Sequence, residues 1–435
     1  MATSPTDCEV SRAPQQPLLP AAPVEAPVEA LREVLRRFGT PTYAYDMGRL
    51  RAQVTKVRSH LPAGVDALYS LKANASLGLC SYFAGCGLGA DVASAGELVT
   101  AVEAGFPAER IFVSGPDKSP AVLAQLPSVP GALISVDSVS ELRTLAGLGR
   151  PSRAVLRLRP DFHSCAACAA GPDSRFGLLT ADLPACRPYL ASGGIRVVGF
   201  HVFAGSQVLD AGGIIHHLRG GLEQSLRAAN VLDLTPELID LGGGFGIPYG
   251  PGDAELDLDA VAEELRSLID RAAPARLLLE LGRYFVAQAG WYLTTVIAQQ
   301  THQGRPAVVV DGGTHQRGDL CGLGLRRKAF SPSVLAGARA PLNRTDVLGC
   351  LSLPADVLAE ASPLPPLSAG DVLAFPNAGA YGLTASPTLF HGHPAPAEVV
   401  FDGTALELIR ARQPARSLLE GQNRLREPGI RGTGP

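Results

Sequence analysis

Eight short apolar segments, each followed by a longer intervening stretch, constrain the fold of this chain more than any other feature of its sequence. They lie at residues 66–71, 89–92, 111–115, 133–136, 154–159, 197–202, 238–241 and 276–281. The stretches between them, such as Ala95–Ala104 and Ser140–Leu148, have helical length and are amphipathic or rich in Ala and Leu. Strands that alternate with helices in this way favour a parallel sheet. We therefore predict an α/β fold, a (β/α)8 TIM barrel.

The flanking segments give the expected domain organisation. We expect residues 1–26 to form a disordered Pro/Ala-rich leader, and residues 27–46, with a helix at 27–38 and a short strand at 42–45, to pack on a second domain. The barrel is expected at 47–284. Residues 285–409 are expected to form a β domain, because strand-like runs there are separated by loops rich in Pro and Gly. The polar, Arg-rich residues 410–435 are expected to be a flexible tail.

Composition limits the partners of the chain. The net charge of −3 provides no basic surface for nucleic acid or an anionic membrane. No apolar run is long enough to span a bilayer, and the N-terminus lacks the pattern of a secretory signal. The eight cysteines show no framework spacing, so we expect reduced thiols in a cytoplasmic protein. Cys165 and Cys168 form a CxxC without a second pair, and no metal site is predicted.

Lys72 directly follows the first apolar segment, in the sequence Tyr69-Ser70-Leu71-Lys72-Ala73-Asn74. The reactive groups of a barrel enzyme lie at the C-terminal ends of its strands. A lysine there is expected to project into the mouth of the barrel, where burial lowers its pKa and makes the amine nucleophilic. Such an amine can form an imine with an aldehyde cofactor. Taken alone, a lysine is more often a solvated surface residue.

Three successive glycines, Gly242, Gly243 and Gly244, end the seventh segment directly after Asp240 and Leu241. Glycines let the main chain approach an anion closely, and barrels often bind phosphate in the loops after strands seven and eight. The alternative is a merely flexible loop. The position of the run after this strand favours a phosphate site.

The eighth and sixth segments also end in polar residues. Glu280 can bond a protonated pyridine nitrogen, and Arg283 can add positive charge to a phosphate site. His201 can stack on a cofactor ring, and Ser206 can bond its phosphate. A buried Glu–Arg ion pair and a packed core histidine are the structural alternatives for these residues.

Together and in order, these motifs resemble the fold-type III pyridoxal-phosphate-dependent decarboxylases, the diaminopimelate/ornithine decarboxylase group, from Pro41 to about Gly403. Residues 69–74 are similar to the family's Y-x-x-K-A-N, and residues 91–97 to its D-V-A-S-x-x-E. The resemblance implies a Schiff base between Lys72 and pyridoxal 5'-phosphate. It further implies that the cofactor is bound by Asp91, Arg157, His201, Ser206, Gly242, Gly243, Gly244, Glu280, Gly282, Arg283 and Tyr381.

The resemblance also implies a head-to-tail homodimer with shared active sites, in which each site borrows a loop from the partner's β domain. Here that loop departs from the family pattern G-P-x-C-(E/D/T)-x-x-D. Ser352 stands at the position of the proton-donating cysteine, Cys350 lies two residues earlier, and Leu353 replaces an acidic group. We expect Ser352 or Cys350 to be catalytic, and Asp356 and Tyr381 to contact substrate. Because Leu353 removes the acidic partner of a distal ammonium, lysine-type and ornithine-type substrates are disfavoured.

The sequence HVFAGSQ around His201 is similar to a branch found in biosynthetic clusters, some of whose members act on carrier-bound amino acids. We therefore predict a carbon–carbon lyase that releases CO2 from a small-molecule amino acid, either modified or linked to a carrier protein. Two alternatives remain: an inactive or weakened cofactor-binding regulator, which the altered loop favours, and a diaminopimelate decarboxylase proper. A racemase or a barrel without cofactor fits the ordered motifs less well.

Overall fold

Eight parallel strands close into a barrel in the computed structural model, which describes residues 25–116, 118–150, 152–163, 168–169, 171–318, 331–335, 342–403 and 405–424. The strand order around the barrel is β10-β11-β2-β3-β4-β5-β6-β8. These strands are β2 (Val65–Ser70), β3 (Gly89–Val92), β4 (Ile111–Val113), β5 (Leu133–Val136), β6 (Ser152–Arg157), β8 (Ile195–His201), β10 (Leu238–Gly243) and β11 (Arg276–Leu281). The predicted TIM barrel is confirmed.

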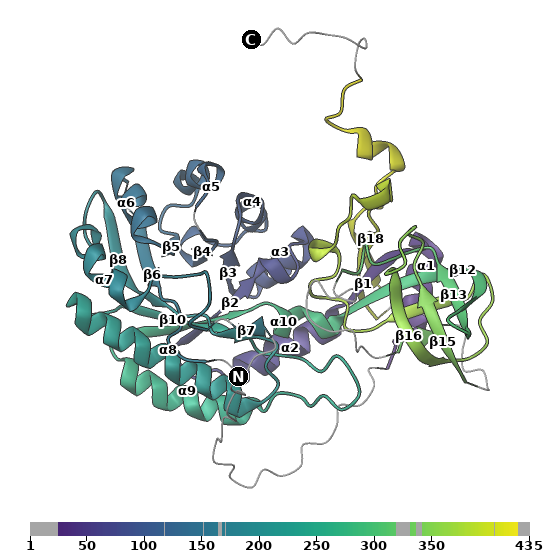
Figure 1. The fold of residues 1–435 in the computed structure, drawn as a ribbon, viewed down its shortest axis with the longest axis horizontal. Coiled ribbons are helices and arrows are strands. Elements are labelled where there is room, and N and C mark those ends of the chain that lie inside the picture. The colour runs from purple at the N-terminus through teal and green to yellow at the C-terminus, as the bar shows by residue number, and fades with distance from the viewer. Residues whose placement is uncertain are drawn as a thin grey trace, which may run out of the picture.

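Helices surround the barrel (Figure 1). They are α2 (Met47–His60), α3 (Leu77–Gly85), α4 (Ala95–Glu103), α5 (Pro120–Gln125), α6 (Val139–Gly147), α7 (Leu183–Cys186), α8 (Ala211–Leu232), α9 (Leu258–Ala272) and α10 (Arg283–Val286). Polar side chains fix several helix starts. The Asp210 carboxylate, for example, accepts a hydrogen bond of 2.8 Å from the Gly213 N–H at the start of α8, which satisfies a donor without a partner inside the helix.

Apolar side chains fill the interior of the barrel, so it is a packed core and not a channel. Each barrel strand except β3 contributes one side chain to a single buried cluster. The cluster comprises Leu68, Phe112, Leu133, Val155, Val198, Leu238 and Leu278. Burial of each such side chain stabilises the fold by about 1.5–3 kcal/mol.

A second sheet lies beside the barrel (Figure 1). Its strands are β1 (Thr42–Asp46), β12 (Gly290–His302), β13 (Arg305–Val310), β14 (Ser333–Val334), β15 (Asn343–Leu348), β16 (Val357–Leu364), β17 (Val372–Phe375), β18 (Ala397–Asp402) and β19 (Ala405–Arg410). The early strand β1 is inserted between β12 and β18. Helix α1 (Val28–Phe38) packs Leu31 and Val34 against Trp291 of this sheet.

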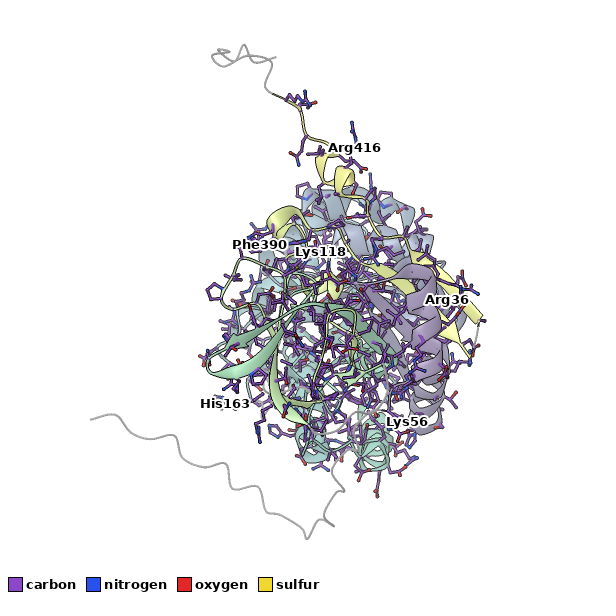
Figure 2. The ribbon with its side chains drawn as sticks, turned by 90° about the vertical axis from the view of Figure 1, so that its right-hand side faces the viewer. Arg36, Lys56, Lys118, His163, Phe390 and Arg416 are labelled. Carbon is purple, nitrogen blue, oxygen red and sulfur yellow. The ribbon has the colours of Figure 1, made fainter. Side chains whose placement is uncertain are left out.

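Part of the segment that we expected to be a flexible tail is anchored. The Arg412 guanidinium donates hydrogen bonds to the carbonyls of Pro41 (2.7 Å) and Phe38 (2.9 Å). Beyond it, a 3-10 turn at Ala415–Leu419 carries Arg416 away from the body of the molecule (Figure 2). Residues 425–435 and most of the predicted leader lie outside the described residues. Among the described helices, none has both the length and the apolar character needed to cross a bilayer.

Candidate active site

Lys72 lies where β2 ends, in a short 3-10 turn over Leu71–Ala73. Its Nζ is 3.5 Å from Asp91 Oδ2 at the end of β3 and 3.7 Å from Glu280 Oε2 at the end of β11. It also lies 5.3 Å from the centroid of the Phe203 ring, which follows β8. The ends of adjacent parallel strands thus place one amine between two carboxylates.

The charge environment of Lys72 differs from our expectation. We predicted that burial would lower its pKa. Desolvation does act in that direction, but the negative charges of Asp91 and Glu280 outweigh it and raise the pKa of Lys72. The sequence placed both carboxylates near a cofactor but gave no indication that they would lie within 4 Å of this amine.

Glu280 is deeply buried, with 2 % of its side chain exposed. Burial, and then the charge of Asp91, raise its pKa to about 7. Its Oε1 has no hydrogen-bond partner within the described residues, although His201 Nε2 lies 3.4 Å away without a well-aligned bond. A buried carboxylate oxygen with spare accepting capacity is suited to a donor that belongs to a ligand.

His201 is held as a neutral ring. Burial, and then the charge of Arg157, lower the pKa of His201 well below its ordinary value. Its Nδ1 forms a 2.9 Å hydrogen bond with the Ser135 hydroxyl, which fixes the ring orientation. Arg157 ends β6, and its guanidinium is 3.4 Å from Asp137 Oδ1. A neutral, oriented imidazole at this position provides a flat surface next to Glu280.

The glycine run forms a close-packed turn and not a merely flexible loop. A Cβ on Gly243 would lie 1.8 Å from the Glu280 carbonyl oxygen, and one on Gly244 would lie 2.1 Å from the Gly205 carbonyl oxygen. Gly244 also has φ +87°, a conformation that side chains rarely adopt. The Gly242 N–H donates to Asp240 Oδ1 at 2.7 Å, which shapes the turn. Because glycine has no side chain, an anion can approach the main chain here more closely than it could at any other residue type.

The remaining predicted cofactor residues gather around the same pocket, which contains about 330 Å³ of space between atoms, partly open to solvent. Its lining includes Lys72, Phe203, Ser206, Gly244, Glu280, Gly282, Arg283 and Tyr381. The Arg283 guanidinium lies 4.5 Å from the centroid of the Tyr381 ring, and it donates a 2.6 Å hydrogen bond to the Tyr249 hydroxyl. The Tyr381 N–H donates to the Ala73 carbonyl at 2.7 Å, so a loop from the second sheet closes against the lysine turn.

Two hydrogen bonds explain why the D-V-A-S-x-x-E segment contains a serine and a glutamate at these positions. Ser94 accepts a hydrogen bond of 3.2 Å from the Glu97 N–H, and the Glu97 carboxylate accepts one of 2.7 Å from the Ala93 N–H. This reciprocal capping begins α4. It fixes the chain just after Asp91, so Ser94 and Glu97 position the end of β3 and need no contact with a ligand.

The loop at residues 349–356, whose sequence departs from the family pattern, is held in place by Asp356. The buried Asp356 carboxylate accepts hydrogen bonds from the Thr314 N–H and hydroxyl (2.7 Å each) and from the Leu351 N–H (2.8 Å). Its predicted contact with substrate is not tested by these bonds and stays a prediction. Ser352 and Leu353 lie exposed at the tip of the loop, and burial raises the pKa of the Cys350 thiol to about 11.

Sequence reasoning missed three residues that shape this site: Phe203 beneath the Lys72 amine, Ser135 behind His201, and Tyr249 on Arg283. Ser135 carried a usable signal, because it is a polar residue within the apolar segment 133–136. Phe203 and Tyr249 lie in loops with no distinguishing pattern.

Chemically, the site combines an amine, a buried acceptor and a backbone cradle for an anion.

Known proteins resemble this chain over most of its length. Residues 47–287 match the family model described as "Pyridoxal-dependent decarboxylase, pyridoxal binding domain". An L-glutamyl-[BtrI acyl-carrier protein] decarboxylase of Niallia circulans is 32% identical over 407 residues, covering 89% of this chain and 94% of the relative. A diaminopimelate decarboxylase of Actinosynnema pretiosum subsp. auranticum is 35% identical, covering 89% and 90%. The structure of Helicobacter pylori diaminopimelate decarboxylase with L-lysine superposes with a TM-score of 0.81 at 24% identity, covering 90% and 98%.

Proposed function

Because the chain belongs to the pyridoxal-dependent decarboxylases, and is a carbon–carbon lyase that uses pyridoxal phosphate to decarboxylate an amino acid, we propose which of its residues perform this reaction and which substrate they select. The observation that carries the residue assignment is the position of the Lys72 amine, between Asp91 and Glu280 and beside the glycine cradle. The proposal covers the roles of the individual residues, the dimer and the substrate class.

The residues present fit the cofactor. Pyridoxal phosphate, when bound, supplies an electrophilic aldehyde and a conjugated ring that accepts the electron pair left when CO2 departs. Lys72 would bond to the aldehyde once its ammonium has given up a proton. Glu280 Oε1, which has no hydrogen-bond partner among the described residues, would accept a hydrogen bond from the protonated ring nitrogen, and His201 would provide a flat face for the ring. The glycine turn, in which the Gly242 N–H is already bonded to Asp240, would hold the phosphate together with Ser206, Arg283 and Tyr381.

Reprotonation of the substrate carbon is assigned to the 349–356 loop. Within the described residues, the hydrogen bonds of this loop run to segments of the second sheet, such as Thr314 and Gly312, and none runs to a residue that lines the Lys72 pocket. The exposed tip at Ser352 and Leu353, where Leu353 is 43% exposed, fits a loop that is covered by a second copy of the chain. We therefore retain a homodimer in which Ser352 or Cys350 serves the partner's site.

The substrate we propose is an amino acid without a free distal ammonium, attached to an acyl carrier protein, which places the enzyme in a biosynthetic role. Leu353 offers no charge for an ammonium, and a relative of similar length acts on a carrier-bound glutamyl group by its name. We also propose a cytoplasmic location. The four cysteines whose side chains the structure describes are all free, in line with a reducing compartment.

The test is a panel of substrates assayed for CO2 release by the cofactor-loaded full-length chain. The panel contains free glutamate, meso-diaminopimelate, lysine and ornithine, and the same amino acids loaded on an acyl carrier protein. We expect release from a carrier-linked amino acid and little from free diamino acids. Ordinary turnover of free meso-diaminopimelate would overturn the substrate assignment. If the cofactor-loaded protein releases no CO2 from any substrate of the panel, the regulator alternative would be favoured.

A further inference from the structure

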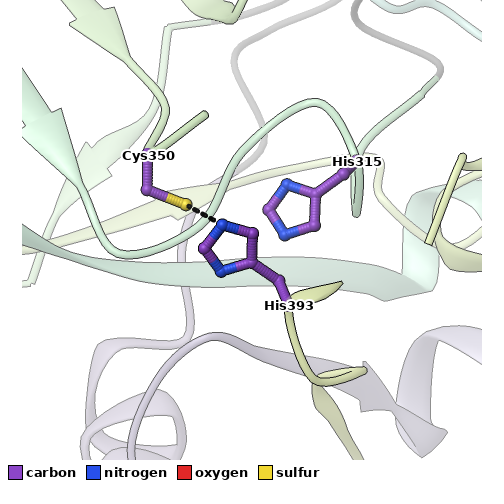
Figure 3. Close-up of side chains that lie close together, drawn as sticks. All are labelled: His315, Cys350 and His393. Atoms are coloured by element: carbon purple, nitrogen blue, oxygen red, sulfur yellow. Dashed lines mark hydrogen bonds between the residues drawn. The ribbon is translucent and has the colours of Figure 1, made fainter. Parts of the chain in front are cut away.

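Three side chains of kinds that can bind a metal ion, from distant parts of the sequence, converge in loops of the second sheet: His315, Cys350 and His393 (Figure 3). His315 follows β13, Cys350 follows β15 and His393 precedes β18. Cys350 Sγ is 3.8 Å from His393 Nε2, and the donor atoms of the three residues all lie within 4.8 Å of one another. None of the three lines the Lys72 pocket.

His315 carries the stronger evidence that something binds here. Its side chain is buried, at 1% exposure, and neither ring nitrogen has a hydrogen-bond partner among the described residues. A buried polar atom without a partner is uncommon in folded proteins, because it loses its bonds to water and gains nothing in exchange. An imidazole in this situation is suited to a ligand that takes up a nitrogen lone pair.

Hydrogen bonds hold the backbone next to the three residues. The Asp356 carboxylate binds the Thr314 N–H, next to His315, and the Leu351 N–H, next to Cys350. The Cys350 N–H donates to the Gly312 carbonyl at 3.0 Å. On the other side, the Gln316 side chain donates to the Pro394 carbonyl at 3.2 Å, which ties the segment after His315 to the segment after His393. These bonds preorganise all three donors without using their side chains.

We propose that His315, Cys350 and His393 form a zinc site with three protein ligands and one open position. Two nitrogens and a sulfur are donors that Zn²⁺ prefers, and three protein ligands are typical of sites that keep a position for water or substrate. With Zn–S of about 2.3 Å and Zn–N of about 2.0 Å, a tetrahedral ion holds its S and N ligands about 3.5 Å apart. The observed 3.8 Å is close to that value.

His315 supplies the third donor of the proposed site, and its ring centroid lies 4.7 Å from that of His393. The His391 ring lies farther out, at 6.4 Å from that of His393, and is not included. Binding converts the Cys350 thiol to a thiolate bonded to the metal and releases one proton to solvent. Cys350 is then unable to donate a proton to the substrate carbon, which leaves Ser352 as the side-chain donor in the partner-directed loop.

The experiment uses the full-length chain, stripped with a chelator under reducing conditions and then titrated with ZnCl2 in competition with a chromophoric chelator. We expect one tight Zn²⁺ per chain. Replacing a ligand, in Cys350→Ser, His315→Gln or His393→Gln, is expected to weaken binding by more than about 100-fold, since even loss of an outer partner costs 10- to 100-fold. Cys86→Ser, at a free cysteine elsewhere, is the matched control and retains wild-type affinity.

Cobalt substitution gives a second readout that does not depend on turnover. Co²⁺ bound by these donors is expected to show a thiolate-to-cobalt charge-transfer band and intense tetrahedral ligand-field bands. Cys350→Ser should lose the charge-transfer band while its far-ultraviolet circular dichroism stays that of the wild type. Absence of tight binding, or equal binding by wild type and Cys350→Ser, would overturn the site, and neither result would bear on whether the enzyme decarboxylates.

Discussion

Replacement of Glu280 by glutamine tests the electrostatic design of the pocket. The substitution keeps the shape of the side chain and removes a charge that lies 3.7 Å from the Lys72 amine and that is 2 % exposed. Glutamine still accepts a hydrogen bond but no longer stabilises a protonated ring nitrogen. A hydrogen bond to a charged group contributes about 1.5–3 kcal/mol, which corresponds to a loss of about 10- to 150-fold in kcat.

The assay is CO2 release at saturating substrate, with cofactor content measured by absorbance. We expect Glu280→Gln to keep its cofactor, because the glycine cradle and Lys72 are unchanged, and the pKa of Lys72 to fall, because one of the two carboxylates that raise it is gone. The matched control is Glu264→Gln, which removes another buried carboxylate, bound to Arg219 outside the site. If Glu280→Gln keeps kcat within twofold of wild type, or if the control loses as much, the assigned role of Glu280 is refuted.

Three further predictions concern the cradle, the loop and the pH range of stability. Gly244→Ala should weaken cofactor affinity by at least about tenfold, because the new side chain strains the backbone and collides with its neighbours. Gly252→Ala, at a glycine with a similar φ of +88° but open space around it, should leave cofactor affinity unchanged. Equal effects of the two substitutions in a cofactor titration would contradict this prediction. Asp356→Ala should lower the free energy of unfolding by about 3 kcal/mol, because buried donors lose their acceptor; an unchanged urea midpoint would argue against it. Burial, helped by its neighbour's charge, lowers the pKa of His217 to about 4. The unfolded chain therefore binds more protons there between about pH 6.5 and 4, and stability is lost as the pH falls through that window. In urea unfolding measured against pH, His217→Gln should flatten that loss by up to about 3 kcal/mol. A profile identical to that of the wild type would contradict this prediction.

The barrel could be predicted from the sequence because its strands are buried on both faces and appear as continuous apolar runs. The second sheet was harder. Strand β15 begins with the polar Asn343-Arg344, and β16 contains Pro363, so neither gives a recognisable apolar pattern. The insertion of β1 between β12 and β18 joins segments more than 240 residues apart, which no local pattern encodes.

The candidate site could likewise be predicted from the sequence only in part. Lys72, Glu280 and the glycine run were recognisable because each directly follows a strand, and strand ends converge in a barrel. The raised pKa of Lys72 could not be recognised from the sequence, because it depends on the distances from its amine to two carboxylates. The cluster of His315, Cys350 and His393 was missed entirely, because its members are spaced by 35 and 43 residues and come together only through the pairing of β13 with β15 and the course of the loop before β18.

The most direct test of the central claim is the identity of the lysine that bonds to the cofactor. The full-length chain, loaded with pyridoxal phosphate, is reduced with borohydride, digested and mapped by mass spectrometry. We predict that the reduced pyridoxyl group is found on Lys72. Modification of another lysine, such as Lys118, which is buried 3.2 Å from Glu141, or no modification at all, would contradict the account.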